Sequence, residues 1–77
     1  MNGAGRVQEF LDQVAEVLEV PSVGPEDDFR QVPLWSSLAA FGILTMLEQR
    51  YGLQLGLADL QAARTVRDLA KRAGVGD

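Results

Sequence analysis

The chain has 77 residues and a formal net charge of −4, and it contains neither cysteine nor histidine. This composition excludes zinc fingers, thiol nucleophiles and every Ser-His or Cys-His catalytic arrangement. A chain of this length forms one domain with one small core, and its free energy of unfolding should be on the order of 4 to 12 kcal/mol.

The negative charge is concentrated in the first part of the sequence. Residues 1–33 contain two basic and seven acidic side chains, a net charge of −5, whereas residues 34–77 carry a net charge of +1. An acidic surface repels phosphate backbones, so we expect no nucleic-acid partner. The N-terminal segment lacks the pattern of a targeting peptide, and the longest apolar run is about half of what a bilayer requires. These features predict a cytoplasmic protein without membrane association.

Between residues 4 and 20, apolar side chains recur at intervals of three and four, which predicts an amphipathic first helix. The apolar positions are Val7, Phe10, Leu11, Val14, Val17 and Leu18. Pro21 disfavours helical geometry at the residue before it, so this helix should end at Val20.

Residues 21–35 contain all three prolines and show no sustained period, which predicts a long loop. A loop of this length needs apolar contacts that hold it against the domain. The available side chains are Phe29, Val32, Leu34 and Trp35. We expect Phe29 to be the buried one, and we interpret Trp35 as a contact between the loop and the bundle.

The most apolar run of the chain lies in the second predicted helix, residues 36–51. Gly52 supplies the backbone freedom that ends it. The expected inward stripe consists of Leu38, Phe41, Leu44, Leu47 and Tyr51, with Ile43 on its flank.

Two serines, Ser36 and Ser37, stand at the start of this second helix. A serine there can cap backbone N–H groups that have no partner within the helix. The same N–H groups, together with the helix dipole, also favour a phosphate group. One cap is sufficient, so the second hydroxyl is open to modification. Without a neighbouring base, neither serine is an activated nucleophile by itself.

Two shorter helices are predicted after Gly52. Leucines that shift to helical spacing indicate one at residues 57–63, and Thr65 with Asp68 forms a capping-box pattern at the start of another, residues 65–73. The predicted fold is therefore all-α. We expect residues 1–77 to form a single small antiparallel four-helix bundle, with three main helices, one short helix and the long loop between the first two.

The sequence resembles the acyl and peptidyl carrier proteins, whose second helix begins with a short Asp-Ser-Leu motif. The corresponding residues here are Ser36, Ser37 and Leu38. Other positions agree at the family's spacing without a gap, and they cover most of the chain: Phe29, Phe41, Leu44, Leu47, Glu48, Tyr51, Gly52, Thr65 and Val66.

The resemblance implies that Ser37 carries 4′-phosphopantetheine, transferred from coenzyme A by a separate, magnesium-dependent phosphopantetheinyl transferase. The thiol of this arm would hold acyl or aminoacyl intermediates as thioesters, and the protein itself would be a non-catalytic carrier. Its further partners would be the loading and processing enzymes of an assembly pathway. Ser36 replaces the family's Asp, and we expect it to be the N-cap.

The second helix departs from the acidic strip of carriers in general fatty acid synthesis, because Glu48 and Arg50 are its only charged residues. This departure favours apolar docking in a polyketide, nonribosomal peptide or related specialised pathway. Leu38 is either part of the inward stripe or, as the resemblance implies, an exposed contact beside the arm that touches partners. Met46 is either such a contact or part of the rim packing. We expect Glu48 to contact partners, and for Trp35 we favour the loop contact over a contact with the cargo. We expect a monomer. The main alternative is an unmodified carrier-like interaction module, which the missing Asp leaves open.

Overall fold

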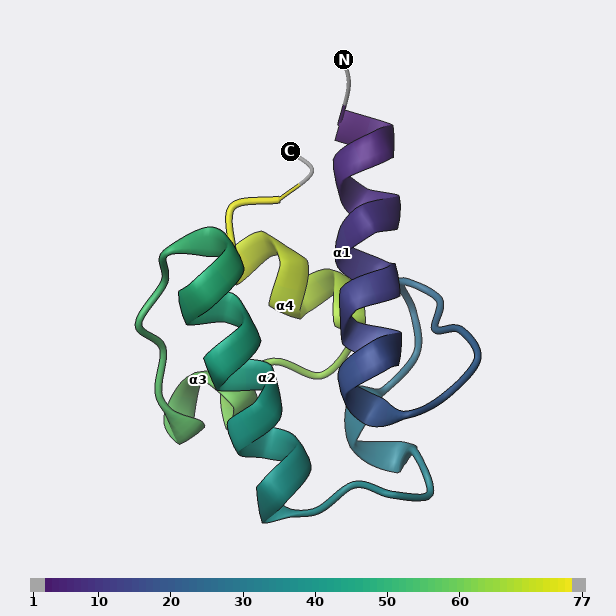
Figure 1. The fold of residues 1–77 in the computed structure, drawn as a ribbon, viewed down its shortest axis with the longest axis vertical. Helices are drawn as coiled ribbons and strands as arrows, with labels where there is room; N and C mark the ends of the chain where they lie inside the picture. The colour runs from purple at the N-terminus through teal and green to yellow at the C-terminus, as the bar shows by residue number, and fades with distance from the viewer. Residues whose placement is uncertain (1–2, 76–77) are drawn as a thin grey trace.

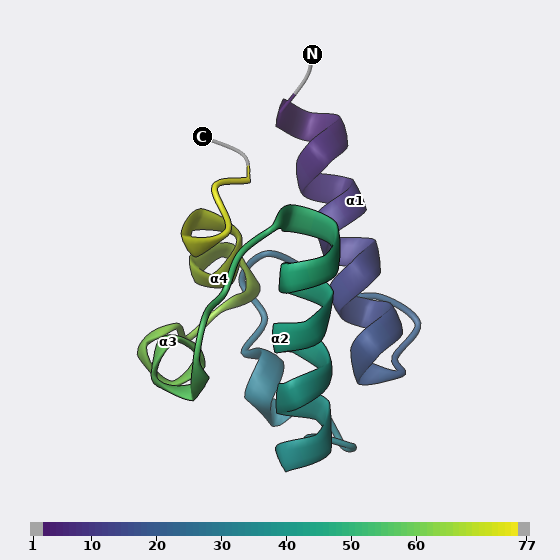
Figure 2. The ribbon, with the colours of Figure 1, turned by 60° about the vertical axis from the view of Figure 1, so that its left-hand side comes forward.

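The computed structural model describes residues 3–75 and is all-helical within them, which confirms the predicted fold class (Figure 1). In chain order the elements are α1 (Gly3–Leu18), the 3-10 helix η1 (Phe29–Gln31), α2 (Ser37–Tyr51), α3 (Leu57–Ala62) and α4 (Val66–Arg72). Helices α1 and α2 lie side by side and run in opposite directions (Figures 1 and 2). Helix α4 packs against α1, and α3 packs against α2. No helix of the described residues is long and apolar enough to cross a membrane.

Helix α1 buries the apolar face that the sequence predicts, including Phe10, Val14 and Leu18. It ends at Leu18, two residues before the predicted end at Val20. The reason is a left-handed residue, Glu19, with a φ of 58°. The N–H groups of Glu19 and Val20 donate to the carbonyls of Glu16 and Ala15, at 3.2 and 3.1 Å, and so close the helix end. The chain has left the helix before Pro21 can affect it.

The loop between α1 and α2 is anchored through Phe29, which is completely buried, as expected from the sequence. Phe29 opens η1, a turn that the sequence did not predict. Asp28 caps this turn, because its carboxylate accepts a hydrogen bond from the Arg30 N–H at 2.9 Å. The ring of Trp35 contacts Phe29 edge to face, with centroids 5.6 Å apart. The two aromatic rings therefore fix both ends of the segment that leads into α2.

A second anchor joins the same loop to α4. The carbonyls of Pro25 and Asp27 accept hydrogen bonds from the N–H groups of Arg67 and Val66, at 2.8 and 2.9 Å. These N–H groups lie in the first turn of α4, where they have no partner within the helix. The loop thus supplies the hydrogen-bond acceptors that the first turn of α4 lacks within the helix.

The start of α4 also carries the capping box that the sequence predicts. The Thr65 hydroxyl accepts a hydrogen bond from the Asp68 N–H at 3.2 Å. The Asp68 carboxylate accepts hydrogen bonds from the N–H groups of Arg64 and Thr65, at 3.1 and 3.2 Å. These hydrogen bonds lower the pKa of Asp68 from its ordinary value of 3.8. The carboxylate is therefore charged, and able to cap the helix, at neutral pH.

Helix α2 buries only part of the predicted stripe: Leu47 and the flanking Ile43 are fully buried, and Leu44 and Tyr51 are partly buried against the core. Leu38 and Phe41 expose 82% and 54% of their surfaces, so their assignment to the inward stripe is wrong. The buried residues of α2 are Ala40, Ile43, Met46 and Leu47. Apolar residues surround most of this helix, so their spacing alone does not define one face. Packing against α1 and α3 selects the face that is buried.

The close approach of α1 and α2 depends on Gly42. A Cβ atom added at Gly42 would lie 2.9 Å from Cγ1 of Val17, which is shorter than a normal contact between two carbon atoms. Glycine usually weakens the interior of a helix, and here its missing side chain makes room for the neighbouring helix.

Replacing Phe29 by alanine should remove the main anchor of the loop. We expect Phe29→Ala to lower the free energy of unfolding by about 3 to 5 kcal/mol, as large core truncations do. Leu34→Ala is the matched control, because Leu34 lies in the same loop but is 58% exposed and should change stability by about 0.5 kcal/mol or less. Urea unfolding followed by circular dichroism measures both changes. Equal losses in the two variants would contradict the role of Phe29.

Candidate functional site

The start of α2 presents two exposed serines at one end of the molecule. Ser36 is the N-cap: its backbone is extended, and its Oγ accepts a hydrogen bond from the Ala39 N–H at 3.3 Å. Its carbonyl accepts the first hydrogen bond of the helix, from the Ala40 N–H at 2.9 Å. The capping function at this position is therefore already provided by Ser36.

Ser37 is the first residue of α2, and its side chain is exposed. Within residues 3–75 its hydroxyl forms no hydrogen bond, and the N–H groups of Ser37 and Leu38 have no acceptor. A phosphate group on Ser37 would therefore lie at the positive end of a helix of 15 residues, beside N–H groups that lack partners. The arrangement fits a covalently attached phosphodiester.

An open cavity of about 310 Å³ lies beside Ser37. Residues from η1, from the end of the loop, from α2 and from α3 line it: Arg30, Trp35, Ser36, Ser37, Ala40, Leu57, Leu60 and Gln61. Arg30 is the only charged residue among them. Most of the remaining wall is apolar, so the cavity suits a flexible chain that carries a negative charge near its attachment point.

Exposed apolar side chains flank the two serines. Leu34, Leu38 and Phe41 expose 58%, 82% and 54% of their surfaces. Leu34 and Leu38 border one shallow hollow together with Ser36, and Leu38 and Phe41 border another on the side of α1. We call these three residues the apolar rim. A partner that covers the rim would also reach Ser37.

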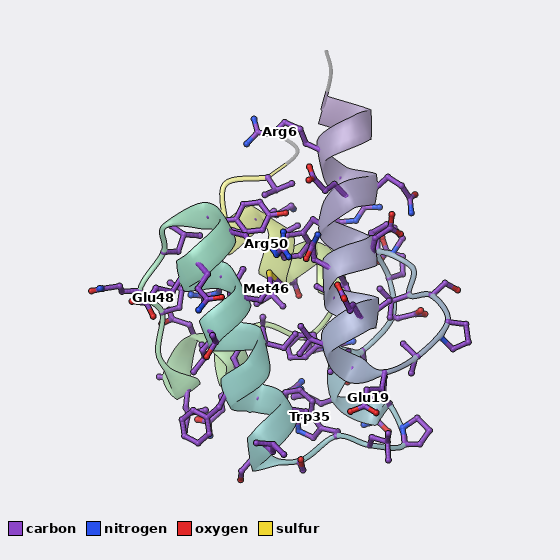
Figure 3. The ribbon with its side chains drawn as sticks, viewed as in Figure 1. Arg6, Glu19, Trp35, Met46, Glu48 and Arg50 are labelled. Atoms are coloured by element: carbon purple, nitrogen blue, oxygen red, sulfur yellow. The ribbon has the colours of Figure 1, made fainter. Side chains whose placement is uncertain are left out.

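The other two residues that the sequence suggested as partner contacts, Glu48 and Met46, differ in their exposure. Glu48 is exposed on α2, as Figure 3 shows. Met46 exposes only 6% of its surface and belongs to the core cluster, while its exposed part borders the hollow of Leu38 and Phe41. Of its two interpretations, this burial favours rim packing.

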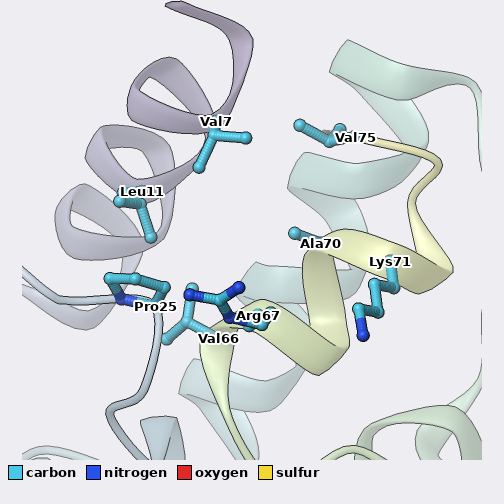
Figure 4. A pocket seen from close by; sticks show the side chains of 8 residues that line it. All are labelled: Val7, Leu11, Pro25, Val66, Arg67, Ala70, Lys71 and Val75. Carbon is cyan, nitrogen blue, oxygen red and sulfur yellow. The ribbon is translucent and has the colours of Figure 1, made fainter. Parts of the chain in front are cut away.

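A second cavity lies away from the serines, between α1 and α4 (Figure 4). It measures about 170 Å³, and no residue of α2 lines it. Its apolar walls include Val7, Leu11 and Val75. The side chains of Arg67 and Lys71, both on α4, also line it. This cavity is therefore separate from the site at Ser37.

Sequence reasoning missed Arg30 and α3 as parts of the site. Arg30 is the only basic residue between Arg6 and Arg50, so an isolated cation shortly before the serine pair was the available signal. Leu57 and Leu60 follow helical spacing, but their position across from Ser37 depends on how α3 packs against α2.

Comparison with known proteins gives one family. The family model described as "Phosphopantetheine attachment site" matches residues 8–73, a range that includes Ser37 and reaches from α1 to the end of α4. The match confirms the resemblance found in the sequence. No curated protein and no solved structure matches the chain significantly.

The two serines should differ in their effects on stability. Ser36→Ala removes the cap of α2 and should lower the free energy of unfolding by about 1 kcal/mol, whereas Ser36→Asp should keep the cap. Ser37→Ala is the matched control and should have little effect, because its hydroxyl has no hydrogen bond within the described residues. Thermal unfolding of the three variants measures the difference. A larger loss in Ser37→Ala than in Ser36→Ala would contradict the assignment of the cap.

Proposed function

The chain belongs to the phosphopantetheine-attachment family, and on this basis we propose that it is a carrier protein whose 4′-phosphopantetheine arm is attached to Ser37. The cofactor of the family is covalently bound. The observation that supports Ser37 is the contrast between neighbours: the Ser36 hydroxyl caps α2, while the Ser37 hydroxyl is exposed and has no hydrogen bond within residues 3–75.

Attachment would form a bond between Ser37 Oγ and the phosphorus atom that bears the pantetheine. The phosphoanhydride bond of coenzyme A breaks, adenosine 3′,5′-bisphosphate leaves, and the hydroxyl gives its proton to a base. The chain contains no histidine, and no acidic or basic side chain of the described residues is hydrogen-bonded to Ser37. The phosphopantetheinyl transferase must therefore supply the base. In this proposal Ser37 is modified and does not catalyse a reaction.

The arm supplies a thiol that holds acyl or aminoacyl groups as thioesters, and the chain has no cysteine of its own. The contribution of the protein is to hold the arm at an exposed end and to present a surface to its partners. Those partners are the transferase and the loading and processing enzymes of the pathway.

We infer that partners dock mainly through the apolar rim, Leu34, Leu38 and Phe41. Helix α2 carries only Glu48 and Arg50 as charged residues, so it lacks the acidic strip of carriers in general fatty acid synthesis. This supports a polyketide, nonribosomal peptide or related specialised pathway over fatty acid synthesis. An unmodified interaction module is the alternative, favoured by the absence of an acid at Ser36. The cap that Ser36 provides argues against this alternative. Serine in place of the family's aspartate removes a charge but leaves the start of α2 intact.

The carrier function predicts covalent modification at one serine. Incubation with coenzyme A, magnesium and a broad-specificity transferase should add one phosphopantetheine unit to the wild-type chain and to Ser36→Ala. Ser37→Ala should remain unmodified. Intact mass spectrometry of the three proteins measures the result. If several transferases leave the wild-type mass unchanged, the interaction module becomes the better explanation.

Docking through the apolar rim predicts a weak dependence on salt. Between about 50 and 300 mM salt, we expect kcat/KM of the transferase for the unmodified chain to change less than about threefold. Leu38→Ala should lower kcat/KM by about tenfold, which corresponds to about 1.4 kcal/mol of lost contact. Glu48→Gln is the control for charge and should have a smaller effect. A steep loss of activity with salt would show that charges govern docking.

A further inference from the structure

Arg30 is a cation in the cavity that also contains Ser37. It is the only basic residue between Arg6 and Arg50, and its guanidinium forms an ion pair with the carboxylate of Asp28. A phosphodiester on Ser37 Oγ would place a full negative charge at the same cavity. Opposite charges attract more strongly in a partly desolvated cavity than in open water.

The guanidinium of Arg30 is held in place before any ligand arrives. Its Nε donates to the Asp28 carboxylate at 3.4 Å, and its Cζ lies 5.7 Å from the centroid of the Phe29 ring. The side chain is 30% exposed. Because Phe29 is completely buried, the surface under the guanidinium is rigid.

Donors of Arg30 remain available for an anion. An arginine side chain has five N–H groups, and the one hydrogen bond of this guanidinium within residues 3–75 comes from Nε. The terminal nitrogens can therefore contact phosphate oxygens while Nε keeps its bond to Asp28. Arginine commonly binds phosphate in this manner, through two parallel hydrogen bonds.

The rest of the cavity suits the part of the arm that follows the phosphate. This part contains a carbon that bears two methyl groups, then a carbon that bears a hydroxyl group, and then two amide groups. Trp35, Leu57 and Leu60 provide apolar surface, and Gln61 provides an amide that can donate and accept hydrogen bonds. These side chains come from the loop and from α3, so the arm would lie between them.

We propose that Arg30 is the counter-ion of the arm's phosphodiester and that the cavity between η1 and α3 holds the first part of the arm. The inference rests on the proposed attachment at Ser37. It assigns a positioning role to a residue outside the serine motif. The role is to keep the arm docked between transfers and to limit the volume that it explores.

Trp35 is the only tryptophan of the chain, so its fluorescence reports on this cavity. We expect attachment of the arm to lower the acrylamide quenching constant of Trp35 in the wild type by about twofold, because a docked arm covers the indole. In Arg30→Gln, the ratio of docked to free arm should fall roughly five- to tenfold, equivalent to about 1 to 1.4 kcal/mol. Arg30→Lys should give an intermediate value, since lysine keeps the charge without the planar fork.

Arg6→Gln is the matched control for net charge, because Arg6 lies at the opposite end of the molecule from Trp35 (Figure 3). It should leave the protection of Trp35 unchanged. Arg30→Gln should still fold, since the Asp28 cap of η1 uses the backbone N–H of residue 30. As a second measurement on the wild type, the NMR signals of the terminal Nη–H groups of Arg30 should shift when the arm is attached.

The outcomes separate this inference from the proposed function. Without a mass gain on Ser37, the carrier function fails and the inference fails with it. If the mass increases but the quenching of Trp35 is the same before and after attachment, the inference is overturned and the carrier function is not. Equal protection in the wild type and in Arg30→Gln, or Arg30 Nη–H signals that do not move, also overturns it.

Discussion

The burial of Phe29 is the constraint on which the arrangement of the site depends. Its ring fills the core from a loop, so the segment before α2 cannot move away from the bundle. Trp35 packs on the ring of Phe29, and Ser36 is the next residue along the chain. The position at which α2 begins is therefore fixed by core packing, and the exposure of Ser37 is a consequence of that position.

The two serines show how one helix terminus serves two purposes. A helix start needs one side-chain acceptor, and Ser36 provides it without a charge. The next residue is then free of any capping requirement, and its hydroxyl faces solvent. Aspartate at the position of Ser36 would cap equally well and would add a negative charge beside the proposed attachment point, Ser37. Ser36 retains the cap of α2 and leaves the surroundings of Ser37 less acidic than an aspartate would. This lower charge agrees with the apolar character of the rim.

Local rules predicted those parts of the structure that depend on neighbouring residues. The capping box of Thr65 and Asp68 needs only residues three positions apart, and the apolar face of α1 repeats along one helix. The end of α1 was predicted two residues late, because no glycine marks the left-handed position that Glu19 occupies. The buried face of α2 was predicted only in part, with Leu38 and Phe41 misplaced, since apolar residues surround the helix. Arg30 was missed because its distance from Ser37 along the chain gives no indication of a shared cavity.

Gly42 sets a limit on how this carrier could change its partners. It lies where α2 approaches α1, so any side chain at this position, charged or not, would meet Val17 of α1. Acquiring negative charge at this position would require the two longest helices to separate or Val17 to become smaller. The interhelical spacing and the surface chemistry of α2 are therefore coupled, and a lineage that evolved toward charged partners would have to alter α1 as well as α2.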